Sequence, residues 1–264
     1  MVRRSLVLAF VALVACGPVI PPVPVPPRPP TTPFSVGLTF APFTEPEWAH
    51  FMAWPKSPLW RVELDQAPVV QALSQSYLLV AIAESDASVQ ALLPYLPQAW
   101  GIELGNEPNF GQDAVSVNAW YSRMIPLIRA TGYQGHILTA GVGNIDDSTL
   151  QWLSTSLQGL PGDVVAGVHF YSAWHGQIPK LLGVLNARRW AMSESGMDQP
   201  TPALEQQAVP YMASVCQSAY DAGSLSCIGY QTHSAASGKD ANFGIFRVDG
   251  TSRPWEQSMI GAIR

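Results

Sequence analysis

The stretch Trp100-Gly101-Ile102-Glu103-Leu104-Gly105-Asn106-Glu107-Pro108-Asn109, residues 100–109, decides the fold class. Its first half is a short apolar run of strand length, and its second half is a polar segment of turn-forming residues. Residues 115–130 then carry apolar side chains at helical spacing. A strand followed by a helix is a βα unit, which predicts a parallel sheet.

The same alternation continues on both sides of this stretch. Apolar runs predict eight strands, at residues 34–40, 59–64, 77–83, 100–104, 136–140, 164–170, 190–193 and 227–231. Helical spacing predicts helices at residues 68–76, 87–96, 115–130, 149–157, 178–186, 204–222 and 254–263, with a less regular pattern at 45–52. Eight βα units in 264 residues predict a compact (β/α)8 TIM barrel, with an open doubly wound sheet as the alternative.

The composition is that of a globular protein. Charged residues make up 12% of the chain and hydrophobic residues 47%, which argues against a disordered chain or a coiled coil. The formal net charge of -5 lacks the basic excess that neutralises phosphates, so we expect no nucleic-acid partner. Nine Trp, eight Tyr and nine Phe are candidates for core packing and for flat apolar surfaces that bind a ligand.

Residues 1–16 have the layout of a bacterial lipoprotein signal peptide. Arg3 and Arg4 precede an apolar run, and Leu13-Val14-Ala15-Cys16 resembles a lipobox, in which the cysteine is acylated. An ordinary cleaved signal peptide with an incidental cysteine is the alternative. The lipobox interpretation predicts an exported lipoprotein of the bacterial cell envelope, located at the outer membrane or the cell surface.

A proline-rich segment follows the predicted signal. Residues 17–33 hold nine of the chain's 24 prolines, a composition that extends as polyproline II and spaces a domain away from a membrane. We therefore divide the chain into a signal at 1–16, a linker at 17–33 and one barrel domain at 34–264.

Two cysteines remain in the predicted barrel. Cys216 and Cys227 could form a disulfide in an oxidising compartment, or they could be two free thiols in the core. Because no CxxC or HExxH motif occurs, we expect no metal site and no cofactor. Gly141-Val142-Gly143 lacks the third glycine of a dinucleotide-binding loop, so we interpret it as a turn.

Two carboxylates stand at the ends of predicted strands. In a (β/α)8 barrel such positions line the open face that carries the functional loops. Asn106-Glu107-Pro108 follows the fourth strand and Glu194 ends the seventh, and this combination resembles the clan A glycoside hydrolases, which are retaining (β/α)8 enzymes. The resemblance spans residues 34–264 in strand order. It implies that Glu107 is the general acid/base and Glu194 the nucleophile.

The chemistry of retaining hydrolysis fits these two residues. It needs two carboxyl groups about 5–5.5 Å apart, one ionised to attack the anomeric carbon and one protonated to donate to the leaving oxygen. Once Glu194 is consumed as a glycosyl ester, Glu107 loses its like-charged neighbour and can act as a base toward water.

The resemblance implies supporting roles for three neighbouring residues. Asn106 would hydrogen-bond the sugar 2-hydroxyl, with a structural turn as the alternative. His169 and Tyr171 share one face of the sixth strand by alternation. Tyr171 would contact the nucleophile, while His169 is either a site residue or a buried core histidine.

Arg61 in the second strand resembles the clan arginine that keeps the nucleophile ionised through a charge-assisted hydrogen bond. A buried arginine requires an acidic partner, and Glu63 or Asp65 could be that partner instead of the nucleophile. Glu103 lies deeper in its strand than Glu107, so we interpret it as a structural carboxylate.

Residues beyond the sixth and eighth strands are further candidates for sugar contact. They are Trp174, Gln231 and His233. Many clan members have a Trp at the end of strand eight, whereas this chain has Tyr230-Gln231-Thr232-His233 there.

These features predict a monomeric retaining β-glycosidase that acts on an oligo- or polysaccharide and meets the membrane only through its lipid anchor. The alternative is a non-catalytic carbohydrate-binding lipoprotein on a barrel scaffold. A binding protein has no need of a paired acid and nucleophile, so the pair Glu107 and Glu194 argues against it. A serine hydrolase is disfavoured because Ser193 and Ser195 lack a GxSxG context.

Overall fold

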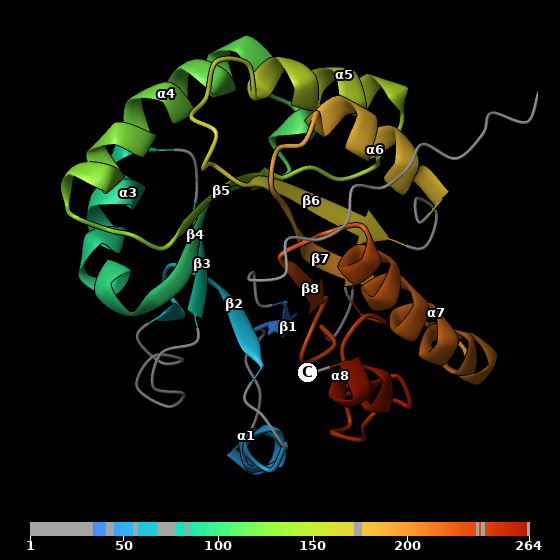
Figure 1. The fold of residues 1–264 in the computed structure, drawn as a ribbon. Coiled ribbons are helices and arrows are strands. Elements are labelled where there is room, and N and C mark those ends of the chain that lie inside the picture. Colours follow the sequence, from blue (N-terminus) through green and yellow to red (C-terminus); the bar gives the residue numbers. More distant parts are fainter. Residues whose placement is uncertain are drawn as a thin grey trace, which may run out of the picture.

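The computed structural model describes residues 34–40, 45–54, 58–67, 78–82, 85–171, 176–235, 238 and 241–262. The eight predicted strands are present, and all of them pair in parallel (Figure 1). Their bounds are β1 Ser35–Thr39, β2 Leu59–Glu63, β3 Leu78–Ile82, β4 Ala99–Asn106, β5 His136–Gly141, β6 Ala166–Tyr171, β7 Trp190–Gly196 and β8 Ser226–Gly229.

The sheet closes on itself. Its strands follow the order β5-β4-β3-β2-β1-β8-β7-β6, and β5 then meets β6. Thr139 N–H donates to the Val165 carbonyl and His169 N–H to the Val142 carbonyl, each over 2.9 Å. Parallel bridges join Leu138 to Val165 and Val142 to Val168. The predicted (β/α)8 barrel is therefore confirmed, and the open doubly wound sheet is excluded.

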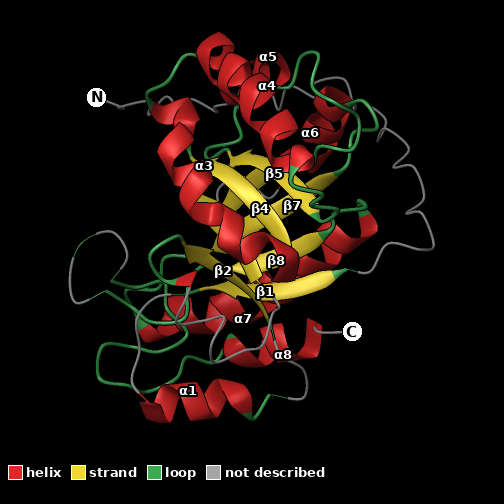
Figure 2. Cartoon of the chain, turned by 90° about the vertical axis from the view of Figure 1, so that its left-hand side faces the viewer, coloured by secondary structure: helices red, strands yellow, loops and turns green. Residues whose placement is uncertain are grey.

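Helices surround the strands on the outside of the barrel (Figure 2). Their bounds are α1 Glu45–Met52, α3 Asp86–Leu92, α4 Ala114–Ala130, α5 Asp147–Ser156, α6 Ile178–Leu185, α7 Pro202–Asp221 and α8 Glu256–Ala262, with 3-10 turns η1 Leu93–Gln98 and η2 Pro108–Phe110. The helix predicted at 68–76 lies outside the described residues. None of the helices in the described ranges is long and apolar enough to cross a membrane.

Capping side chains explain where the helices around the site begin. Asp113 accepts from the backbone N–H of Ser116 over 2.9 Å at the start of α4, and Asp146 accepts from Thr149 N–H over 2.7 Å at the start of α5. Gly132, with φ of +86°, directly follows the C-cap of α4. These signals fix the βα loops that follow β4 and β5.

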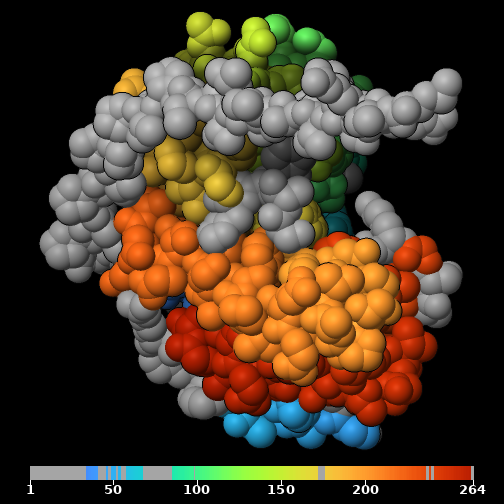
Figure 3. Space-filling model, turned by 90° about the vertical axis from the view of Figure 1, so that its right-hand side faces the viewer, coloured from blue at the N-terminus to red at the C-terminus, as the bar shows by residue number. Residues whose placement is uncertain are grey.

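The core has two parts. Apolar side chains between the sheet and the helices form the larger one, and a smaller cluster inside the barrel contains Leu59, Leu138, Val165, Ala191, Leu225 and Ile228. On one side of the molecule, the orange and red surfaces of α7 and of the C-terminal segment lie against each other, with blue α1 below them (Figure 3).

Cys216 on α7 and Cys227 on β8 form a disulfide, with an S–S distance of 2.01 Å and Cα atoms 5.4 Å apart. Of the two alternatives for these cysteines, the structure thus has the bonded one. The bond joins an outer helix to the barrel wall, and such bonds are typical of oxidising compartments.

Candidate active site

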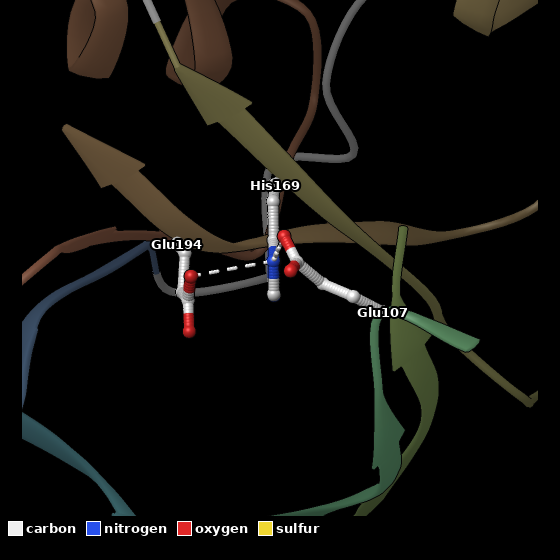
Figure 4. A group of neighbouring side chains, drawn as sticks. All are labelled: Glu107, His169 and Glu194. Atoms are coloured by element: carbon white, nitrogen blue, oxygen red, sulfur yellow. Dashed lines mark hydrogen bonds and ion pairs between the residues drawn. The ribbon is translucent and has the colours of Figure 1, made fainter. Parts of the chain in front are cut away.

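The carboxyl ends of four strands bring the predicted polar residues together. Arg61 comes from β2, Asn106 from the end of β4, His169 from β6 and Glu194 from β7. Glu107 directly follows β4. Figure 4 shows the His169 ring between the side chains of Glu107 and Glu194. Residues far apart in sequence thus form one site at the mouth of the barrel.

Glu107 is held by its backbone. Its φ and ψ of 47° and 45° are left-handed, and its N–H donates to the Gly141 carbonyl on β5 over 2.9 Å. Pro108 begins η2 directly after it. A non-glycine residue in this conformation costs free energy of about 1–3 kcal/mol and is held there by its surroundings. The result is a side chain, 20% exposed, that faces the barrel mouth.

Glu194 is buried and receives two strong hydrogen bonds. Nη1 of Arg61 donates to Oε1 over 2.6 Å, and the Tyr171 hydroxyl donates to Oε2 over 2.5 Å. Burial and the negative charge of Glu194 raise the pKa of Tyr171 far above its ordinary value, so the hydroxyl keeps its proton and remains a donor. Both contacts hold the Glu194 carboxylate in position.

Arg61 connects the two strand ends. Besides Glu194, its guanidinium donates from Nε to Glu103 Oε2 over 2.5 Å and from Nη2 to Asn106 Oδ1 over 2.9 Å. The acidic partners of Arg61 are therefore Glu194 and Glu103. Hydrogen bonds to Glu63 or Asp65, the alternatives that the sequence left open, are not among these contacts. Although burial opposes it, the charges of Glu103 and Glu194 raise the pKa of Arg61 above its ordinary value.

Glu103 is the structural carboxylate that its depth in the strand predicted. It is fully buried, and its Oε1 accepts from Ser193 Oγ over 2.6 Å and from Gly141 N–H over 2.9 Å. Burial alone would raise the pKa of Glu103, but the charge of Arg61, with help from His169 and Ser193, lowers it to about 2. Glu103 therefore stays ionised and compensates Arg61.

His169 lies between three carboxylates. Its Nδ1 is 3.0 Å from Glu107 Oε1 and 3.3 Å from Glu194 Oε2, and its Nε2 is 3.9 Å from Glu103 Oε1. Burial would lower the pKa of His169, but the negative charge of Glu194 and the nearby carboxylates of Glu103 and Glu107 raise it to about 9. At neutral pH the ring is therefore a positively charged donor, and His169 belongs to the site rather than to an apolar core.

Oxygen atoms of Glu107 and Glu194 and a ring nitrogen of His169 lie within 4.8 Å of one another. This spacing lets the three side chains act together on a proton. The short approach of the two carboxylates also fits retaining hydrolysis better than inversion, which needs about 6.5–9.5 Å between the carboxyl groups.

The interpretation of Gly141-Val142-Gly143 as a turn is wrong. β5 runs to Gly141, and Val142 continues the parallel pairing with β6. A Cβ at Gly141 would lie 2.0 Å from the His169 ring, and one at Gly143 would lie 2.6 Å from Glu107 Oε1. Both positions require glycine, because side chains of the site occupy the space that a Cβ atom would fill.

A cavity of about 300 Å³ opens at the two carboxylates. Its wall contains Asn106, Glu107, Tyr171 and Glu194, as predicted, and four residues that sequence reasoning missed: Phe110, Asn144, Tyr230 and Phe243. Phe110 lies just beyond the quoted motif, and Tyr230 sits where many clan members have Trp. The sequence positions of Phe110 and Tyr230 could therefore have predicted that these residues line the cavity. Nothing in the sequence pattern marks Asn144 or Phe243 as cavity residues.

Phe243 reaches the cavity because its loop is tied down. Buried Arg253 donates to the Gly244 carbonyl over 2.5 Å and to Ser234 Oγ over 2.6 Å. The same guanidinium donates to Glu205 on α7 over 3.0 Å. These bonds fix the segment after β8 against the barrel mouth.

Solved structures share this architecture. An endo-β-1,4-glucanase variant from Xanthomonas axonopodis pv. citri is 14% identical with a TM-score of 0.63, covering 87% of this chain and 98% of its own. Cel5A of Thermotoga maritima, in complex with mannotriose, is 11% identical with a TM-score of 0.60, covering 88% and 97%. A xyloglucan-specific endo-β-1,4-glucanase from a metagenomic library, in complex with cellotriose, is 13% identical with a TM-score of 0.60, covering 84% and 88%.

At these identities the structures show the fold alone. Residues 94–214, which include Glu107 and Glu194, match the profile of Cellulase (glycosyl hydrolase family 5). This match to the middle of the chain, together with the shared fold, supports a glycoside hydrolase. No curated protein resembles this glycoside hydrolase closely enough in sequence to count as a relative.

The three predicted sugar contacts beyond the sixth and eighth strands have different outcomes. Trp174 lies outside the described residues. Gln231 is buried, and neither it nor His233 lines the cavity. β8 ends at Gly229, and the Gln231 carbonyl then accepts from Ile245 N–H over 2.8 Å. Sugar contact by Gln231 and His233 stays a prediction that rests on their position after the eighth strand.

Proposed function

We propose that this glycoside hydrolase cleaves internal β-1,4 bonds of a glucan-type polysaccharide, with Glu194 as nucleophile and Glu107 as acid/base. The close approach of these two carboxylates, within 4.8 Å at a cavity that Tyr171, Tyr230, Phe110 and Phe243 line, carries the proposal. The similarity in fold to two endo-β-1,4-glucanases supports a glucan as the substrate.

In the first step, Glu194 attacks the anomeric carbon of the sugar while Glu107 gives its proton to the leaving oxygen. The bond from the anomeric carbon to that oxygen breaks, and an ester bond to Glu194 forms. Arg61 and Tyr171 stabilise Glu194 as the anion that attacks. Asn106, held by Arg61, is placed to hydrogen-bond the sugar 2-hydroxyl.

In the second step, Glu107 takes a proton from water, and the water oxygen replaces Glu194 at the anomeric carbon. The two inversions leave the product in the β configuration. Arg61 supplies a positive charge beside both Glu103 and Glu194. A protonated Glu107 adds no further negative charge before the reaction starts.

A panel of cellulose-type glucans, xyloglucan, mannan and xylan tests the proposal. We expect oligosaccharide products from a β-1,4-glucan backbone, and proton NMR of the first products should show the β anomer. Formation of α anomers would exclude the mechanism, and turnover of mannan or xylan alone would exclude the substrate. Tight binding of sugars without turnover would favour the alternative, a carbohydrate-binding protein on a barrel scaffold.

We also propose that the enzyme is anchored in the bacterial cell envelope, at the outer membrane or the cell surface, through acylated Cys16. The motif Leu13 to Cys16 and the proline-rich residues 17–33 support this. The disulfide between Cys216 and Cys227 agrees with export. Because all the residues that hold Glu107 and Glu194 come from one chain, we propose that it acts as a monomer.

A further inference from the structure

Phe110 is an exposed aromatic residue beside the acid/base. Among the residues that the structure describes, the large hydrophobic side chains that are exposed are Phe110, Val115, Leu127 and Val248. Phe110, which is 57% exposed, is the aromatic one in this group and the one that lines the cavity. A flat apolar ring at the rim of a sugar-cleaving site is therefore available for contact with substrate.

The backbone of Phe110 is held in place. Its backbone N–H donates to the Glu107 carbonyl over 3.2 Å within the tight turn η2. The preceding Asn109 holds Gly143 from both sides: its Nδ2 donates to the Gly143 carbonyl over 3.0 Å, and its Oδ1 accepts from Gly143 N–H over 3.2 Å. The turn after β4 and the loop after β5 are thus joined.

Gly143 brings the ring and the carboxylate together. A Cβ there would lie 2.6 Å from Glu107 Oε1 and 3.1 Å from two ring carbons of Phe110. The side chains of Glu107 and Phe110 therefore both pack against Gly143. The Phe110 ring is therefore next to the carboxyl group of Glu107.

A second group of aromatic residues lies beside Glu194. Tyr171, which donates to Glu194, has its ring centroid 6.2 Å from that of Tyr230 and 5.7 Å from that of Phe243. Tyr230 and Phe243 are 5.8 Å apart. The cavity thus has one aromatic wall beside each carboxylate.

We propose that Phe110 is the platform on which the leaving sugar stacks, which rests on the proposed function. The leaving oxygen takes the proton of Glu107, so the departing ring lies on the side of Phe110 and Asn144. The ring that becomes bonded to Glu194 lies on the side of Tyr171, Tyr230 and Phe243. This orientation selects substrates whose leaving group is a β-linked pyranose with an apolar face, rather than a small alcohol.

Two substrates that transfer the same cellobiosyl group to Glu194 but differ in their leaving group test this orientation. Cellotetraose releases a sugar, cellobiose, whereas β-cellobiosyl fluoride releases fluoride and has no leaving ring. For Phe110→Ala we expect the ratio of kcat/KM on cellotetraose to kcat/KM on the fluoride to fall about 10- to 100-fold, the value of one buried aromatic contact. Phe110→Tyr, which keeps the ring, should restore the ratio.

Leu127→Ala is the matched control, because Leu127 is an exposed apolar residue of α4 outside the cavity wall. It should leave the ratio at the wild-type value. Acceptor sugars enter by the reverse of leaving-group departure, so Phe110→Ala should also lower the yield of transfer to added cellobiose relative to water.

An unchanged ratio in Phe110→Ala, or an equal loss on both substrates, would overturn the platform. If the wild-type chain turns over neither substrate while still binding sugar, the proposed function has failed and the platform with it. Thermal unfolding of each variant shows whether a loss reflects misfolding, and in that case the Phe110→Tyr ratio decides.

Discussion

Arg61 and Glu194 are joined by a hydrogen bond of 2.6 Å between Nη1 and Oε1, and both side chains are buried. The same guanidinium holds Glu103 and Asn106. One cation therefore compensates two buried carboxylates and also orients the residue next to Glu107. Arg61 does not line the cavity, yet it helps to fix the position of the proposed nucleophile, Glu194.

Replacing this cation should damage stability and activity together. Arg61→Met leaves Glu103 and Glu194 buried without their partner, and we expect a loss of about 3–5 kcal/mol in the free energy of unfolding. Urea denaturation measures it. Adding Glu103→Gln to Arg61→Met removes one of the two unpaired charges and should recover part of the stability. A single variant as stable as wild type would contradict the assigned compensation.

The response of alanine variants to azide should distinguish the role of Glu107 from that of Glu194. Glu107→Ala should lose most activity on natural substrates, and azide should partly restore turnover of substrates with a good leaving group, because such a group needs no protonation. Glu194→Ala should form no covalent glycosyl intermediate, which mass spectrometry with a slow substrate detects. Full activity in either variant would exclude the assignment for that residue.

The part of the site that sequence predicted is the part that parallel strands dictate. Glu107 and Glu194 could be placed together because both stand at strand ends, and all strand ends of a barrel face one side. The strands themselves followed from apolar runs, although β7 extends to Gly196, beyond the predicted end at 193. Charged and polar residues interrupt the apolar pattern there because they form the site.

The rest of the site depends on loop paths that local pattern does not specify. Phe243 reaches the cavity through the bonds of Arg253 to Gly244 and Glu205, which join three separate segments. Gly143 looked like a turn residue because its role depends on Glu107 and Phe110, which approach it from another strand. Such relationships appear only once the chain is folded.

The charge on His169 should make stability depend on pH. Its pKa is raised from an ordinary 6.5 to about 9, so protonated His169 stabilises the folded state fully below pH 6.5, and this contribution is lost as the pH rises through 9. The difference in unfolding free energy between wild type and His169→Asn should therefore shrink across this window, by an amount on the order of 3 kcal/mol.

Denaturation series between pH 6 and 10 measure this difference. His169→Asn keeps a hydrogen-bond donor but carries no charge, so it is matched in polarity. A difference that stays constant across the window would show that the fold does not raise the pKa of His169.

Gly143→Ala should lower activity without unfolding the protein. The new methyl group would lie 2.6 Å from Glu107 Oε1, so the carboxylate must move. A displacement of about 1 Å can cost about 100-fold in rate, so we expect kcat to fall about 10- to 100-fold. Gly162→Ala is the control, since a Cβ there meets nothing within 4 Å. Wild-type kcat in Gly143→Ala would contradict this placement of Glu107.

The tether should be separable from catalysis. If Cys16 is acylated, the mature chain partitions with membranes, because each buried methylene of its acyl chains contributes about 0.8 kcal/mol. Cys16→Ser should block processing and release the barrel with an unchanged kcat, since the proline-rich residues 17–33 separate the cysteine from the domain. Fractionation of cells expressing wild type and Cys16→Ser, with immunoblotting and mass spectrometry of the N-terminus, compares them. If both proteins are equally soluble, residues 1–16 are an ordinary cleaved signal, and the anchoring proposal is wrong.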